Sequence, residues 1–100
     1  MIKKWKNKKL SRECWNIDYS FIKWLNEHLK IYLEDAGKVV DLTFREYEYG
    51  GVTYTLEDVI KRMIYLSDEL KNEYYAVNKS YEYTDELLDL FRLVFYDLWW

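Results

Sequence analysis

Residues 18–40 carry the longest regular apolar pattern in the chain, and this pattern constrains the fold more than any other feature. In DYSFIKWLNEHLKIYLEDAGKVV the apolar residues recur at steps of three and four, the spacing that gathers side chains on one face of an α-helix. The face is wide enough to need cover from two other elements, so we expect a bundle. The apolar positions are Phe21, Ile22, Leu25, Leu29, Tyr32, Leu33, Ala36 and Val40.

Both ends of this helix carry signals. The carboxylate of Asp18 is placed to accept hydrogen bonds from the free backbone N–H groups of the first turn. Gly37 costs roughly 1 kcal/mol relative to alanine in a helix interior, so either the helix ends or kinks there, or another backbone passes too close to admit a Cβ. Because Val39 and Val40 continue the apolar period, we favour close approach and expect a helix over 18–41.

A β-hairpin is predicted after the first helix, in DLTFREYEYGGVTYT. Apolar and polar residues alternate on either side of Gly50-Gly51, and a glycine pair accepts the positive φ values of tight hairpin turns. A lone hairpin is marginally stable, so it must lie on the helices or pair with a second copy. Two interpretations stay open: a packed connector, or an acidic, aromatic partner-binding ribbon formed by Glu46, Tyr47, Glu48, Tyr49 and Tyr54.

A second helix is expected over 56–76. Its first residues match a capping box, in which the Thr55 hydroxyl accepts from the N–H of Asp58 and the acid reaches back to the backbone of the threonine. Asp58 is also spaced to pair with Arg62 at i,i+4. Apolar residues then continue on one face, as in an ordinary core helix.

The third expected helix, 84–98, is apolar on almost every side. Thr84 is predicted to cap its start. A helix with so little polar surface is either central or covered by a partner, which makes a homo-oligomer an open prediction. Its expected interface residues are Tyr96, Trp99 and Trp100. The predicted fold is therefore mainly α, three amphipathic helices with one short β-hairpin between helices 1 and 2, in a single domain over 14–100.

Aromatic content is the anomaly in the composition. The 100 residues include 11 Tyr, 5 Trp and 4 Phe. Tyr and Trp have an apolar body and a polar tip, so they suit half-buried sites and binding surfaces. One small core cannot shelter twenty rings, so we expect several of them to face solvent, a ligand or a partner.

Charge divides the chain in two. Residues 1–13 hold six basic residues and one acid, a balance of +5, and since the whole chain carries −3 the other 87 residues carry −8. Residues 1–13 are expected to form a mobile basic arm. The arm is either a solubilising tail or a weak nucleic-acid contact in which lysines meet phosphates and Trp5 stacks on a base.

Little in the sequence supports catalysis. His28 is the only histidine and Cys14 the only cysteine, which excludes internal disulfides and the usual Cys/His zinc sites. We expect Cys14 to be a buried or inert thiol and His28 to be a helix-surface or partly packed side chain. We predict no catalytic residue, no metal and no cofactor. No secretory signal or membrane-spanning apolar run is present, so a soluble, intracellular protein is expected.

Carboxylates are the one catalytic resource to weigh. Glu86-x-x-Asp89 has the spacing of half of the magnesium-binding motif of all-α nucleotide pyrophosphohydrolases of the MazG type. The other half requires Glu-Glu-x-x-Glu, and Asp68, Glu69 and Glu73 are off that spacing by one residue. A solvated acidic face is the better interpretation. An acidic face is complementary in charge to a basic groove, and nucleic-acid-binding enzymes commonly have such a groove.

Three segments, YSFIKWLNEHLKIYLEDAGKVVDL, YEYGGVTYT and the closing LWW, resemble the small Lys/Tyr/Asn-rich proteins encoded by phages of low-GC bacteria. The resemblance implies binding and disabling of a host factor, as anti-CRISPR and other anti-defence proteins do, in the cytoplasm of the infected bacterium. It assigns no functional residue. The resulting hypothesis is a non-catalytic inhibitor that docks on a host protein. An oligomeric small-nucleotide-binding sponge and the magnesium-dependent pyrophosphohydrolase remain as alternatives.

Overall fold

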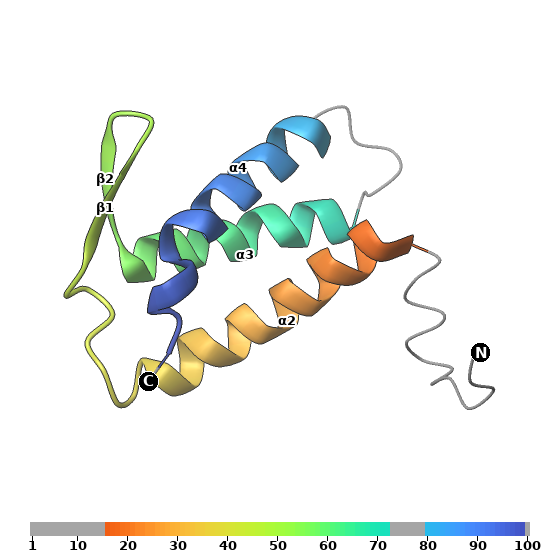
Figure 1. Ribbon diagram of the computed structural model, residues 1–100. Coiled ribbons are helices and arrows are strands. Elements are labelled where there is room, and N and C mark those ends of the chain that lie inside the picture. The colour runs from red at the N-terminus through yellow and green to blue at the C-terminus, as the bar shows by residue number, and fades with distance from the viewer. Residues whose placement is uncertain (1–15, 73–79, 100) are drawn as a thin grey trace, which may run out of the picture.

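A computed structural model describes residues 16–72 and 80–99 of the chain (Figure 1). It confirms the predicted fold class, three helices with a two-stranded antiparallel hairpin between the first two. In chain order the elements are α2 (Ile17–Ala36), β1 (Glu46–Tyr49), β2 (Val52–Thr55), α3 (Leu56–Asn72), α4 (Ser80–Val94) and the 3₁₀ turn η2 (Phe95–Asp97). The predicted arm over 1–13, Cys14 and Trp100 lie outside the described residues.

The core forms where α2 and α4 pack against α3, which runs between them. Both helices contact α3 along much of their length, whereas they contact each other far less. Figure 1 shows α2 and α4 diverging on either side of α3. Each fully buried aliphatic side chain contributes about 1.5–3 kcal/mol of transfer free energy. The most completely buried apolar residues are Leu25, Ala36, Leu56, Val59, Ile60, Met63, Leu66, Leu70, Leu87, Leu90 and Val94.

The start of α3 is the predicted capping box. The backbone N–H of Asp58 donates to Thr55 Oγ1 at 3.1 Å, and the backbone N–H of Thr55 donates to Asp58 Oδ2 at 3.2 Å. The predicted pair between Asp58 and Arg62 is wrong. Arg62 instead donates from Nε (2.7 Å) and Nη2 (3.0 Å) to the two carboxylate oxygens of Glu86. Glu86 offers the guanidinium a bidentate partner across the helix pair, while the Asp58 carboxylate is turned back to its own helix start.

The start of α2 differs from the prediction by one position. The helix begins at Ile17, with Asn16 before it, so Asp18 lies inside the first turn and does not cap it. Asp18 Oδ1 accepts from the backbone N–H of Tyr19 at 2.8 Å. Its negative charge still lies at the positive end of the helix dipole.

The end of α2 is also earlier than predicted, at Ala36 and not at residue 41. The backbone N–H groups of Val39 and Val40 both donate to Ala36 O in a closing turn. A Cβ built on Gly37 would lie only 2.7 Å from Leu33 O. The favoured prediction, close approach of another element's backbone, is therefore wrong: the helix ends at this glycine, and the close oxygen belongs to α2 itself, one turn earlier. Val40 packs on the core from the turn, which explains why the apolar period outlasts the helix.

The start of α4 corrects a further prediction. The helix is already formed at Ser80, the first residue described after Asn72 and one turn before the expected cap Thr84, and it ends at Val94. Tyr83 packs partly against the core and so extends the apolar face toward the start of the helix. The expected end of the second helix at residue 76 lies outside the described residues, and α3 is described as far as Asn72.

A buried polar network joins α2 to α3. Asn26 and Ser67 are both 0% exposed. Asn26 Nδ2 donates to Ser67 Oγ at 2.9 Å and to Asp68 Oδ1 at 3.0 Å, and Asn26 Oδ1 accepts from Lys71 Nζ at 3.1 Å. Because a buried amide needs these partners, sliding α2 along α3 would leave it unsatisfied. The network therefore fixes the register of the two helices.

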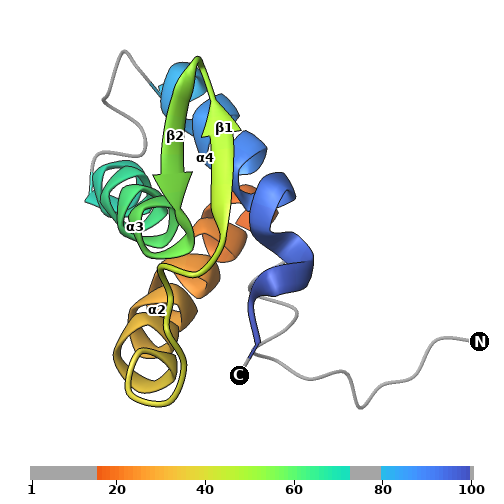
Figure 2. The same cartoon turned by 90° about the vertical axis from the view of Figure 1, so that its left-hand side faces the viewer.

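The hairpin turns at Gly50 and Gly51, with φ of 60° and 79°, as the glycine pair predicts. Tyr47 pairs with Tyr54, and Tyr49 pairs with Val52. Figure 2 shows the hairpin standing at one end of the bundle, in front of α4 and beside α3. None of the helices in 16–72 and 80–99 combines the length and apolar character needed to cross a membrane.

Candidate functional site

The predicted partner-binding tyrosines hold the hairpin to the rest of the molecule. The hydroxyl of Tyr47 donates to Asp97 Oδ2 in η2, and the hydroxyl of Tyr49 donates to Asp89 Oδ2 in α4 at 3.1 Å. Both rings and that of Tyr54 pack partly buried against the core. The packed-connector interpretation therefore describes the three tyrosines.

These contacts change the acid–base behaviour of the two anchoring hydroxyls. Burial is the largest cause that raises the pKa of Tyr47, followed by its hydrogen bond to Asp97. Burial and then the hydrogen bond to Asp89 raise the pKa of Tyr49 in the same way. Both hydroxyls stay protonated, and so remain donors, over the whole neutral range.

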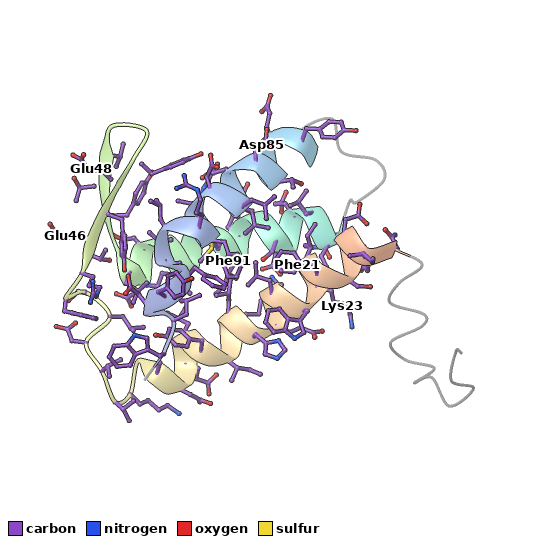
Figure 3. The ribbon with its side chains drawn as sticks, viewed as in Figure 1. Phe21, Lys23, Glu46, Glu48, Asp85 and Phe91 are labelled. Carbon is purple, nitrogen blue, oxygen red and sulfur yellow. The ribbon has the colours of Figure 1, made fainter. Side chains whose placement is uncertain are left out.

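The two glutamates of the predicted ribbon lie on the opposite face of the hairpin. Glu46 pairs with Thr55 and Glu48 with Thr53, so their side chains alternate with the inward tyrosines. Both are exposed, and Figure 3 shows them pointing away from the helices. We call Glu46, Glu48 and Thr53 the acidic hairpin face. It is the part of the predicted ribbon that a partner can reach.

A second surface lies between α2 and α4, where a hollow of about 340 Å³ opens. Near one end of it Phe21 and Phe91 meet edge to face, with ring centroids 5.9 Å apart, and Figure 3 shows them reaching toward each other from α2 and α4. We call this hollow the α2/α4 groove. Its lining residues are Trp24, Leu25, His28, Leu29, Ile31, Tyr32, Phe91, Phe95 and Leu98.

Large apolar side chains form the rim of the α2/α4 groove and are half exposed. Trp24 is 51%, Ile31 56% and Phe95 51% exposed. The exposed ring of His28 stacks on Trp24 with centroids 4.2 Å apart, and its Nδ1 lies 2.7 Å from Trp24 O. With a carbonyl as its neighbour, Nδ1 carries the proton and donates. This contact confirms the prediction of a helix-surface histidine and holds both rings in place.

Two of the predicted oligomer-interface residues, Tyr96 and Trp99, lie next to this groove, and the third, Trp100, is outside the described residues. Tyr96 is 86% and Trp99 is 60% exposed, and the ring of Tyr96 contacts that of Phe95 with centroids 5.0 Å apart. Tyr32, which lines the groove, donates its hydroxyl to Trp99 O at 2.8 Å. The expectation that surplus rings face outward is confirmed by these residues.

Three of the carboxylates weighed for magnesium binding make contacts within the chain, and Glu73 lies outside the described residues. Glu86 is held by Arg62, and Asp89 accepts from Tyr49. Asp68, on the other half of the compared motif, binds Lys30 Nζ at 2.9 Å. In the part of the chain that the structure describes, no group of three or more His, Cys, Asp or Glu side chains could hold a metal ion.

The α2/α4 groove is the feature that the sequence-based prediction did not name. A signal for it exists, because Ile17, Trp24 and Ile31 recur every seven residues and so form a stripe along one flank of the first helix. The stripe lies beside the core face and not on it. It can be separated from the core only when the positions of the neighbouring helices are known.

Comparison of the chain with protein-family models, curated proteins and solved structures gives no match. The surfaces themselves therefore carry the functional argument.

Proposed function

We propose that this protein is a non-catalytic binding protein, a phage-encoded inhibitor of a host factor such as a CRISPR or other anti-phage defence effector in the bacterial cytoplasm. It docks through the acidic hairpin face onto a basic surface of that factor. The observation that carries the proposal is the orientation of Glu46 and Glu48, which are exposed on a hairpin whose other face is anchored to the helices.

Anchoring matters because flexible charges bind weakly. Tyr47 and Tyr49 fix β1 to η2 and α4, and the backbone N–H of Leu56 donates to Arg45 O at 3.1 Å, which fixes the base of the hairpin to α3. The two carboxylates are thus held before a partner arrives, so less conformational entropy is lost on binding.

Charge supports the choice of partner. Residues 14–100 carry −8, and a body of that sign is drawn toward a positively charged groove, which raises the association rate at low salt. Grooves that bind nucleic acid have this positive charge. A nucleic-acid-binding defence effector is therefore the partner class that fits.

Charge reversal on the hairpin tests the proposal against purified effector complexes. The double variant Glu46→Lys/Glu48→Lys is expected to weaken inhibition at least tenfold, mostly through a slower association rate that depends on salt. The wild type should remove effector activity saturably and at fixed stoichiometry.

The matched control is Glu27→Lys/Glu34→Lys, which changes the net charge equally on α2. Both control glutamates are exposed and make i,i+4 contacts to Lys23 (3.5 Å) and Lys38 (3.9 Å), which contribute little to stability. Equal loss of inhibition in the two double variants would contradict docking through the hairpin face.

Two competing hypotheses give different results in the same preparations. A small-nucleotide sponge would release an unchanged nucleotide after heating, whereas a pyrophosphohydrolase would release pyrophosphate from nucleoside triphosphates with magnesium and would lose that turnover on Glu86→Gln. In the part of the chain that the structure describes, no lining residue of the α2/α4 groove except His28 can carry a positive charge. These residues offer a nucleotide base rings to stack on but little to hold its phosphates.

A further inference from the structure

We infer that the α2/α4 groove is a homodimer interface, in which two copies of this chain meet with their grooves face to face about a two-fold axis. This inference is independent of the proposed function, because it uses a different surface from the acidic hairpin face.

The packing of the helices is the first argument. α2 and α4 each have a full partner in α3 but only limited contact with one another, so the third side of the bundle formed by residues 16–72 and 80–99 is open. The groove there exposes the apolar flanks of both helices. Helices with apolar flanks of this width require cover, and two helices from a second copy, laid across the opening, supply it.

The exposed area is the second argument. Trp24, Ile31 and Phe95 at the rim, with Tyr96 and Trp99 beside them, are between 51% and 86% exposed. A large aromatic side chain accounts for about 150–250 Å², and with the isoleucine counted in the same range these five expose roughly 450–750 Å². A specific protein interface buries about 800 Å² on each partner. These five side chains therefore supply more than half of the area that a stable dimer needs.

The distribution of charge favours a second copy over another occupant. Among the described residues, no Asp, Glu, Lys or Arg lines the groove. Two copies whose bodies each carry −8 repel wherever acids face each other, and this neutral side is where they can approach. A positively charged partner gains no electrostatic attraction from an uncharged groove. Glu46 and Glu48 on the hairpin would attract such a partner more strongly.

Shape also favours a second copy. A two-fold interface requires one patch to be complementary to itself. The groove combines a hollow of about 340 Å³ with half-exposed rings at its rim. The rim ring of one copy can enter the hollow of the other, and symmetry repeats the contact. The Trp24–His28 stack holds one of these rings in place in the free chain.

Concentration-dependent mass, measured by sedimentation velocity on the full chain from roughly 1 µM to roughly 1 mM, tests the inference. The wild type is expected to form a dimer and nothing larger. Ile31→Lys is expected to weaken the dimer at least tenfold, because two-fold symmetry places two buried ammonium groups in one interface. The new lysine lies one turn from Glu27 and from Asp35, so the helix itself tolerates it.

Val39→Lys is the matched control, because Val39 is also an exposed β-branched residue, 65% against 56% for Ile31, and lies just beyond the same helix. It should dimerise as the wild type does. A wild type that remains monomeric up to 1 mM overturns the inference, whether the groove is then empty or held by residues 1–13. A dimer that Ile31→Lys weakens no more than Val39→Lys also overturns it.

A fluorine NMR spectrum of the chain labelled with 5-fluorotryptophan gives a readout that does not depend on the lysine variants. The Trp24 resonance, assigned with Trp24→Phe, is expected to shift on dilution through the dimer dissociation range. A Trp24 resonance that stays constant while the mass changes would place the interface elsewhere and refute the assignment of the groove.

Discussion

Truncating Asn26 to alanine tests the polar contact that fixes the register of α2 against α3. The amide is 0% exposed and lies between Ser67 and Asp68 on one side and Lys71 on the other. Removing it breaks these hydrogen bonds and leaves a void in a tightly packed region. Since no buried side-chain nitrogen or oxygen in the described residues lacks a partner, the wild type is fully satisfied before the change.

The expected cost follows from what each partner retains. Ser67 Oγ keeps its donation to Met63 O at 2.8 Å, and Asp68, whose side chain is 36% exposed, keeps Lys30 at 2.9 Å and can hydrate. The polar loss is therefore about 1–2 kcal/mol, below the sum for three full hydrogen bonds. A void of roughly 30 Å³ adds somewhat under 1 kcal/mol. We expect Asn26→Ala to lower the free energy of unfolding by about 2–3 kcal/mol.

A double-mutant cycle separates the hydrogen bond from the void. Urea unfolding of Asn26→Ala, Ser67→Ala and the double variant should give a coupling energy of about 1 kcal/mol between the two sites. Asn72→Ala, at the exposed end of the same helix pair, should change stability by less than about 0.5 kcal/mol. If Asn26→Ala behaves like Asn72→Ala, or if the cycle gives no coupling, the network does not join the helices as argued.

Three further measurements address other contacts. Glu86→Gln should lower the free energy of unfolding in urea by about 1 kcal/mol, because it weakens the bidentate contact with Arg62. If high salt leaves the difference in stability between variant and wild type unchanged, the contact is not electrostatic in origin. Gly51→Ala should cost about 1 kcal/mol and lower the Tm, because its φ is 79° although its Cβ would meet nothing within 4 Å; an unchanged Tm would refute this. Since burial and then Asp97 raise the pKa of Tyr47 above its usual value of about 10, an unfolded chain loses this proton first, so stability should fall as pH rises above about 10. Tyr47→Phe should flatten that fall in pH-dependent denaturation, and an equally steep decline in the variant would exclude Tyr47 as its source.

Local signals in the sequence predicted the elements that depend on neighbouring residues. Thr55 and Asp58 cap each other three residues apart, and Gly50 and Gly51 need only their own backbone freedom. Both features are present as expected. The helix ends were predicted less well, because the apolar residues of the core do not stop where the predicted helices stop. Val40 packs against the core from beyond the end of α2, and Tyr83 packs against it from before the expected start of α4.

The candidate surfaces depend on contacts between distant residues, which spacing cannot reveal. Tyr47 and Tyr49 of the hairpin turn inward because Asp97 and Asp89, 50 and 40 residues later, accept hydrogen bonds from their hydroxyls. The composition did predict that some rings would remain exposed. Which rings they are follows from the angle at which α2 and α4 leave α3, and that angle is set by side-chain packing.

Because α3 lies between the other two helices, residues 16–72 and 80–99 share one core, and no part of them could fold by itself around a separate one. In a fragment without residues 56–72, the apolar faces of α2 and α4 would have no helix to pack against. A cut or insertion inside this segment therefore removes the whole tertiary structure, whereas extra residues between Gly50 and Gly51 extend only an exposed turn. The hairpin tip is for that reason the place to graft a label or a second binding module.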